Sequence, residues 1–143
     1  MIHQRTHIRS AAHGVIRAAL AAGITVRQAS PYDLGRDLMP CVFVTGGDGS
    51  AQVAGQSLAR EMMLEISIVD RGTAEAIEDQ LDALQAQVEI ALAADPQLGG
   101  ACQSLHLTQE KRAFEKAEDV LGEALLLFRV VYGTTRRDPT TLT

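Results

Sequence analysis

Two long stretches of alternating side chains most constrain how this chain folds. In residues 60–70 the even-numbered positions from 62 to 68 are all Met, Leu or Ile, and the other parity is largely polar. In residues 120–132 every even-numbered position is apolar or glycine, and the odd-numbered positions mix apolar and charged side chains. A period of two places successive side chains on opposite faces of a β-strand. Both stretches are therefore predicted to be strands with one face on a core.

Two other segments have the three- and four-residue spacing of amphipathic helices. Residues 3–22 carry apolar side chains at such steps, and Gly23 supplies a stop. Residues 74–94 form the clearer helix, with Thr73 as its candidate N-cap and Asp95 at its end. Its predicted buried stripe consists of Ile77, Leu81, Leu84, Val88 and either Ala91 or Leu92.

Shorter segments complete the predicted elements. A glycine-rich loop is expected over residues 46–57, and residues 30–35 are turn-like. Residues 109–119 fit either a helix or a long hairpin loop, and both alternatives stay open. The remaining strands are predicted at residues 24–27, 41–45 and 103–108.

Blocks of strands and helices in this order indicate an α+β fold with a mostly antiparallel sheet of four to five strands, flanked by two main helices. The chain has 143 residues and 46% hydrophobic residues, enough to bury one core without a metal or disulfide. We expect a single α+β domain over residues 1–133. The polar residues 134–143 are expected to form a mobile C-terminal tail.

No motif predicts catalysis, a cofactor or a metal. His3 and His7 are four residues apart, but the residues between them include no acid, and Arg5 and Arg9 repel a cation. The glycines of residues 46–50 lack the Lys-Ser/Thr of a phosphate loop. No signal peptide or membrane span is predicted, and the two cysteines are interpreted as small buried hydrophobes.

The charges are sorted along the chain. Residues 1–27 contain four Arg and no acid, whereas residues 61–95 contain nine acids and one Arg. Chance and solubility can explain this sorting. The alternative is head-to-tail self-association, in which a basic surface of one copy meets an acidic surface of the next. The mixed face of the last strand is too apolar for bare solvent, so a helix or a neighbouring copy should cover it; its apolar residues are Leu121, Leu125, Leu127 and Val131. The net charge of −5 and the scarcity of aromatics argue against a nucleic-acid reader.

Several short segments, in order, match one protein family. They are the opening helix, the segment 38–44 (LMPCVFV), the segment 60–66 (REMMLEI), the helical segment 81–84 (LDAL), the segment 95–100 (DPQLGG) and the closing segment 128–132 (FRVVY). In this order and spacing the chain resembles the tail terminator proteins, or minor tail proteins, of long-tailed bacteriophages and related gene-transfer particles. The resemblance spans residues 3–138.

This resemblance implies a virion protein at the head-proximal end of the tail, made in the host cytoplasm. It implies a homohexameric ring that caps the completed tail tube and joins it to the head or neck. The implied partners are other copies, the tail tube protein and a neck or head-completion protein, and DNA passes through without specific binding. No enzymatic residue is implied. The candidate interface residues are Arg5, Arg9, Arg17, Asp48, Glu75, Glu78, Asp79, Asp82, Leu125, Leu127, Arg129, Arg136 and Arg137.

Three other functions stay open at the level of sequence. Another head–tail joining protein, such as a neck or tail-completion subunit, is the nearest alternative. A small cytosolic enzyme requires a pocket with convergent polar groups, which the sequence does not reveal. A ligand-binding dimer is the third alternative, and it predicts a lasting dimer that never forms rings on tail tubes.

Overall fold

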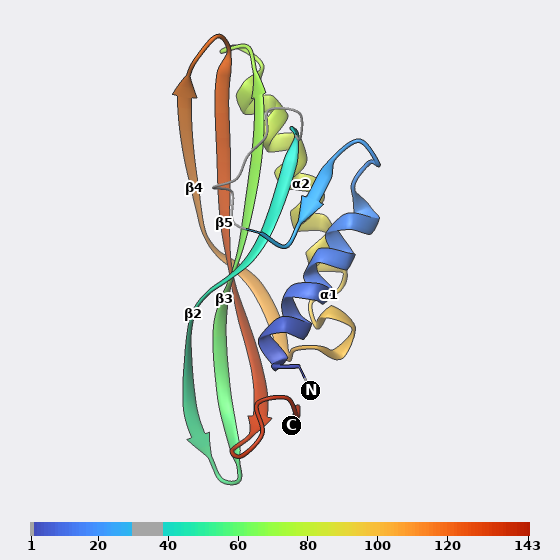
Figure 1. The fold of residues 1–143 in the computed structure, drawn as a ribbon, viewed down its shortest axis with the longest axis vertical. Coiled ribbons are helices and arrows are strands. Elements are labelled where there is room, and N and C mark those ends of the chain that lie inside the picture. Colours follow the sequence, from blue (N-terminus) through green and yellow to red (C-terminus); the bar gives the residue numbers. More distant parts are fainter. Residues whose placement is uncertain (1, 30–38) are drawn as a thin grey trace.

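The computed structural model describes residues 2–29 and 39–143, which form a twisted five-stranded sheet with two α-helices on one face (Figure 1). Neighbouring strands follow the order β1-β2-β3-β5-β4; β1 and β2 are parallel and the other pairs antiparallel. The predicted α+β class with a mostly antiparallel sheet is confirmed. In chain order the elements are α1 (Gln4–Ala19), β1 (Thr25–Arg27), β2 (Cys41–Ala54), β3 (Ser57–Gly72), α2 (Ile77–Ala94), a 3-10 turn η3 (Leu98–Gly100), β4 (Ser104–Lys116) and β5 (Val120–Thr135).

The core lies between the sheet and the two helices. The even-numbered apolar residues of β3 and β5 face it, and Ile66 and Leu126 are completely buried. Ile8 and Ile16 of α1 and Leu81 of α2 cover them from the helical side. The predicted faces of both long strands and the predicted buried stripe of α2 are confirmed, and Leu92 rather than Ala91 is the buried residue at its end. Burial of these aliphatic side chains is the main stabilising term.

Both helices are shorter than predicted. Helix α1 ends at Ala19, because Leu20 is already extended, with φ −93° and ψ 153°. Helix α2 begins at Ile77 rather than at residue 74. The Oγ1 of Thr73 accepts a hydrogen bond from the N–H of Ala76 at 3.2 Å, so Thr73 closes the turn before the helix instead of capping the helix. End residues are poorly specified by periodicity alone.

The predicted loop over residues 46–57 is wrong. Strand β2 continues to Ala54 and pairs with β3, with a register shift between Gly46 and Gly49. The glycines mark this β-bulge and a close approach. A Cβ on Gly49 would lie 2.9 Å from the carbonyl oxygen of Glu61 and 2.9 Å from Nη1 of Arg5. Glycine density alone does not distinguish such a strand from a loop.

Residues 109–119 form neither a helix nor a long loop. Strand β4 runs to Lys116, and the turn into β5 is tight, with Ala117 N–H donating to the carbonyl oxygen of Asp119 at 2.8 Å. The strand is at the edge of the sheet, and a second register shift lies between Leu107 and Gln109. Most side chains of the second half of β4 are exposed whichever face they lie on, so this segment lacks the apolar–polar alternation that identifies the central strands.

The C-terminal residues lie against the body of the protein. Thr134 and Thr135 belong to β5, so the sheet extends past the predicted domain end at residue 133, and Thr134 is completely buried. Thr143 N–H donates to the carbonyl oxygen of Gly133 at 3.1 Å, and Gln4 N–H donates to that of Pro139 at 3.1 Å. These contacts argue against a mobile tail over residues 134–143, whose mobility stays a prediction. The predicted turn 30–35 lies outside the described residues.

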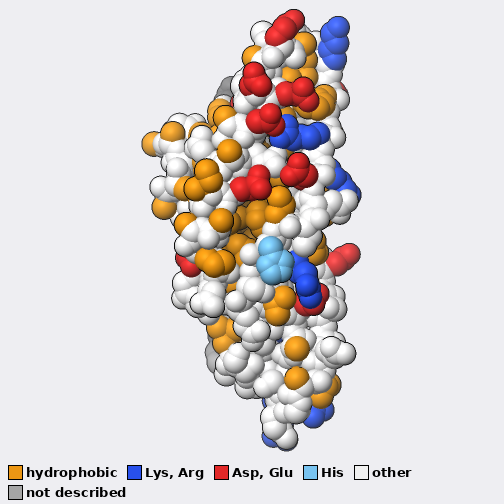
Figure 2. Space-filling view, turned by 180° about the vertical axis from the view of Figure 1, so that it is seen from behind, with side chains coloured by type: hydrophobic (Ala, Val, Ile, Leu, Met, Phe, Trp, Pro, Cys, Tyr) orange, Lys and Arg blue, Asp and Glu red, His pale blue; other side chains and the backbone are white. Residues whose placement is uncertain are grey.

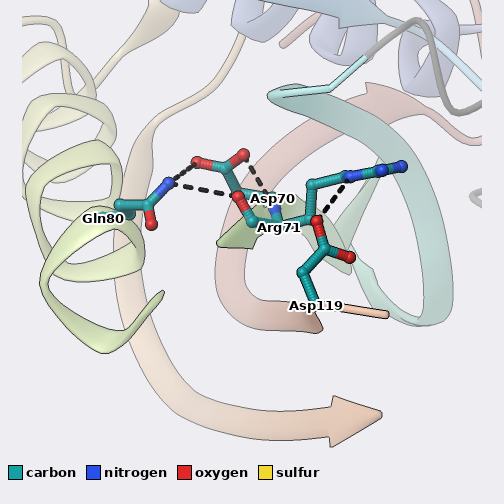
Figure 3. Close-up of polar contacts among 4 residues, drawn as sticks. All are labelled: Asp70, Arg71, Gln80 and Asp119. Atoms are coloured by element: carbon teal, nitrogen blue, oxygen red, sulfur yellow. Dashed lines mark hydrogen bonds and ion pairs between the residues drawn. The ribbon is translucent and has the colours of Figure 1, made fainter. Parts of the chain in front are cut away.

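A polar cluster ties the start of α2 to the end of β3 (Figure 3). The Nε2 of Gln80 donates to Oδ2 of Asp70 at 3.0 Å and to the carbonyl oxygen of Arg71 at 3.3 Å. Asp70 also accepts from the N–H of Arg71 at 2.8 Å, and the Arg71 side chain forms an ion pair with Asp119 at 3.1 Å. These contacts fix the helix against the β4–β5 end of the sheet.

Candidate interaction surfaces

The sheet face opposite the helices is a candidate interaction surface. Leu125 and Leu127 project from it and are half-buried. Their partners across β3 are Ser67 and Glu65. No helix or strand of the described residues packs over this central part of the sheet. On the same face Cys41, Phe43 and Val69 form a small buried apolar cluster, so the partly exposed apolar surface is confined to Leu125, Leu127 and their neighbours.

An ion pair lies on the same face. The guanidinium of Arg129 on β5 donates to the carboxylate of Glu61 on β3. This hydrogen bond is the main reason that the pKa of Glu61 is lowered and that of Arg129 is raised. Arg129 was predicted to be an interface residue, and in the isolated subunit its charge is already matched by Glu61.

The acidic residues of the α2 region form a second surface. Glu75 lies in the turn before α2, and Glu78 and Asp79 lie in its first turn, all exposed. Acids at this end also favour the positive end of the helix dipole, which is a structural role independent of any partner. Asp82 forms an ion pair with Arg112 of β4 at 2.8 Å. Figure 2 shows acidic side chains gathered over the upper half of this side of the molecule.

An apolar groove lies between the second half of α2 and the start of β4. It has a volume of ≈ 380 Å³ and is lined mainly by hydrophobic side chains. Ile90 at its rim is 70% exposed. A hydrophobic hollow lies beneath the acidic side chains in Figure 2. Sequence reasoning missed this groove; the available signal was an isoleucine outside the buried stripe of α2. The lining residues are Glu89, Ile90, Leu92, Ala93, Leu105, His106, Leu107 and Phe128.

The basic start of α1 is used largely within the subunit. Nη2 of Arg5 donates to the carbonyl oxygen of Gly47 at 2.6 Å, across the β2 bulge. The imidazole of His3 accepts from the N–H of Arg5 at 3.1 Å and caps the helix. Burial, followed by the charges of Arg60 and Arg5, lowers the pKa of His3. Arg9 donates to Thr6 Oγ1 at 3.3 Å. Its Nε is buried without a hydrogen-bond partner among the described residues.

Arg17 and Asp48 are two further candidates, and their surroundings differ from those of Arg5 and Arg9. Arg17 donates to the backbone carbonyls of Leu20 at 3.0 Å and Ala21 at 2.7 Å and to that of Ile24. It thereby satisfies acceptors at the C-terminal end of α1. Asp48 is exposed within the β2 bulge.

The last two candidates, Arg136 and Arg137, directly follow β5, and Arg136 lies beside the tip of the β2–β3 hairpin. The backbone N–H of Arg136 donates to the carbonyl oxygen of Gln56 at 3.1 Å, and its Nη1 donates to that of Gly55 at 3.4 Å. Arg137 follows it and is also exposed. Neither arginine forms an ion pair with a described residue. The predicted candidates thus fall on separate surfaces rather than in one site.

The described part of the chain shows no cluster of three or more His, Cys, Asp or Glu side chains with metal-binding geometry. None of its helices is long and apolar enough to cross a membrane.

No protein-family model and no curated protein sequence matches this chain. Among solved structures, the chain is similar to one chain of a structure described as the virion of a native gene transfer agent (GTA) particle. The two chains are 16% identical, the alignment covers 89% of this chain and 90% of that one, and the TM-score is 0.44.

Proposed function

We propose that this protein is a structural tail terminator, a ring-forming subunit that caps a completed tail tube of a phage-like particle and joins it to the head or neck. The observation that carries the proposal is the arrangement of unmatched surfaces. Among the described residues, no helix or strand packs over three features of the subunit: the half-buried Leu125 and Leu127 on the sheet face, an apolar groove with acids beside it, and a hairpin tip next to two arginines. Such surfaces suit a protein that works by assembling.

The choice of a tail terminator among assembly proteins rests on the ordered sequence segments described above. The α+β fold with a mostly antiparallel sheet agrees with the fold that this resemblance implies. In this proposal the open sheet face and the hairpin tips contact other copies, the tail tube or the neck. The acidic α2 surface lines or flanks the DNA channel, where like charge prevents DNA from adhering.

Deletion of the gene from the genome that encodes the particle tests the proposal. A protein that caps the tube stops its growth, so its loss should give tails of irregular and excessive length that lack heads. Electron microscopy of the particles measures tail length directly, and a plasmid copy of the unchanged gene is the control.

Two other outcomes are informative. Tails of normal length beside filled, tailless heads would show that the protein is a neck or head-completion subunit and not a tail terminator. Normal, infectious particles would overturn both assignments. Mixing the purified protein with free tail tubes provides a second readout, because a terminator should appear as a ring at one tube end.

A further inference from the structure

We propose that the β2–β3 hairpin tip of one copy docks in the α2–β4 groove of a second copy, with Val53 in the groove and Arg136 and Arg137 facing Glu89 and Glu110. This contact rests on the proposed assembly into rings and names the surfaces that form it. The occupant of the groove is thus another copy of this chain.

The groove is built to receive an apolar side chain. Leu92 of α2 and Leu105 of β4 form its sides, with Phe128 of β5 at its base, and all three are less than a tenth exposed. Its volume of ≈ 380 Å³ exceeds that of one side chain, and Ile90 extends the apolar surface outward from the rim. Covering Ile90 removes a large side chain from water, which favours association.

Unmatched negative charges flank the groove. Glu89 of α2 and Glu110 of β4 both accept hydrogen bonds from the neutral Nε2 of Gln85, each at 3.1 Å. Neither carboxylate is in an ion pair with a described residue. The nearby arginine of β4, Arg112, is paired with Asp82 instead. A basic partner therefore fits this rim.

The hairpin tip has the complementary features. Val53 is 61% exposed, and the turn beside it is closed by Gly55 with φ +63°. The hydrogen bonds of Arg136 to Gln56 and Gly55 hold the C-terminal arginines next to this tip. An exposed valine flanked by two unmatched arginines thus faces solvent, while a groove flanked by two unmatched acids is empty. This pairing of apolar surface and opposite charge is what selects the partner.

The tip cannot reach the groove of its own subunit. The groove lies at the level of the Leu64–Phe128 pair, whereas Val53 pairs with Leu58. Six residues of extended strand separate the two levels, which is about 20 Å at 3.3 Å per residue. Figure 1 places the hairpin tip at the lower end of the sheet, beyond both helices. A contact between different surfaces of identical copies is heterologous and closes into a ring when the rotation permits.

Site-directed crosslinking tests the contact in the full-length protein. Val53→Cys and Ile90→Cys are made in two separately tagged chains, which are mixed and treated with a short bismaleimide. The two native thiols should react little with the bismaleimide, because Cys41 and Cys102 are buried. Burial also raises the pKa of both thiols, that of Cys102 to about 11. Ala18→Cys, at an exposed position of α1, replaces Ile90→Cys in the matched control.

We expect the Val53→Cys and Ile90→Cys chains to crosslink at least tenfold more than the control pair. Equal yields would mean random collision and overturn the proposal, as would no crosslink. A product dominated by two Val53→Cys chains would indicate a symmetric tip-to-tip contact and also overturn it. So would capture of the tail tube protein, instead of a second copy, by Ile90→Cys in assembled particles.

Charge exchange provides an independent readout. The pair Arg136→Glu and Arg137→Glu in the Val53→Cys chain should lower the crosslink yield about tenfold, because like charges then face each other. Adding Glu89→Lys and Glu110→Lys to the Ile90→Cys chain should restore the yield. No loss on reversal, or loss without restoration, would exclude the stated charge pairing.

The two proposals fail separately. Rings on tail tubes without the specific crosslink would overturn this contact and leave the terminator function standing. A specific crosslink in a protein whose deletion leaves tails normal would support the contact and overturn the function.

Discussion

At the scale of single residues, Gly122 decides how closely α2 approaches the sheet. A Cβ on Gly122 would lie 2.8 Å from Cδ1 of Leu81 and 2.9 Å from Cγ1 of Ile77. Both helix residues are buried, so little room remains for adjustment. We expect Gly122→Ala to lower the free energy of unfolding by about 1–3 kcal/mol, the usual cost of overpacking a core. Urea denaturation followed by circular dichroism measures this change.

Gly14 is the matched control for the same substitution. It is exposed within α1, and a Cβ there meets nothing within 4 Å. Gly14→Ala should raise the free energy of unfolding by about 0.5–1 kcal/mol, because alanine favours the helix more than glycine does. If both variants shift stability in the same direction, the close approach of α2 at Gly122 is not the cause.

The pH dependence of Glu61 is also a property of one residue and its partner. Its pKa is lowered by the hydrogen bond from Arg129, so the folded state favours the carboxylate. The stability that this pair contributes is present above the ordinary glutamate pKa and is lost as the pH falls through the lowered value. We expect NMR titration of the Glu61 carboxyl to give a pKa below the ordinary value, and Arg129→Gln to raise it.

Lys111→Gln, on the same sheet face, is the control for that titration. It removes a positive charge without removing the Glu61 hydrogen bond. An equal rise in both variants would assign the lowered pKa to general charge rather than to the ion pair.

At the scale of elements, Gln80 connects α2 to β3. Without its Nε2, one oxygen of the buried Asp70 carboxylate loses its donor at 3.0 Å. An unsatisfied buried acceptor costs about 1–3 kcal/mol. Gln80→Leu should therefore lower the free energy of unfolding by that amount, as measured by urea denaturation. Gln87→Leu, at an exposed position of the same helix, should change it by less than about 0.5 kcal/mol.

The accuracy of sequence prediction also differed between elements. Strands β3 and β5 and helix α2 were predicted because each has one buried face, which leaves a period of two or of 3.6 in the sequence. The second halves of β2 and β4 were missed. In β2, Gly46 and Gly49 leave the space that the Arg5 side chain and the β-bulge occupy. In β4, the polar residues face solvent or α2. Neither cause leaves a hydrophobic period.

At the scale of the whole molecule, the acidic α2 surface predicts how the protein meets DNA. Glu75, Glu78 and Asp79 are exposed, and none forms an ion pair with a described residue. We expect no binding of duplex DNA at 150 mM salt, because like charges repel. Changing all three residues to Lys should produce salt-dependent binding, measured by fluorescence anisotropy with a labelled duplex.

Glu115 and Glu118, near the β4–β5 turn, are the comparison in the same assay. Replacing both with Lys changes the net charge by four, against six for the three α2 residues. DNA binding by the unchanged protein would contradict the proposed passive channel surface. Equal gains per added charge in the two variants would show that net charge, rather than the α2 surface, controls DNA binding.

The fold class, the two long core strands and the buried stripe of α2 could be predicted from the amino-acid sequence, because burial of one face imposes a period of two or of 3.6 on the apolar residues. It also indicated the sorting of charge and the unprotected apolar side chains of β5. Which charged side chains are paired with an opposite charge or a backbone acceptor could be seen only in the folded protein. Arg17 is used by its own helix, Arg129 by Glu61 and Asp82 by Arg112, whereas Glu89, Glu110, Arg136 and Arg137 have no ion-pair partner among the described residues. Pairing depends on distances across the fold, which the order of residues along the chain does not contain.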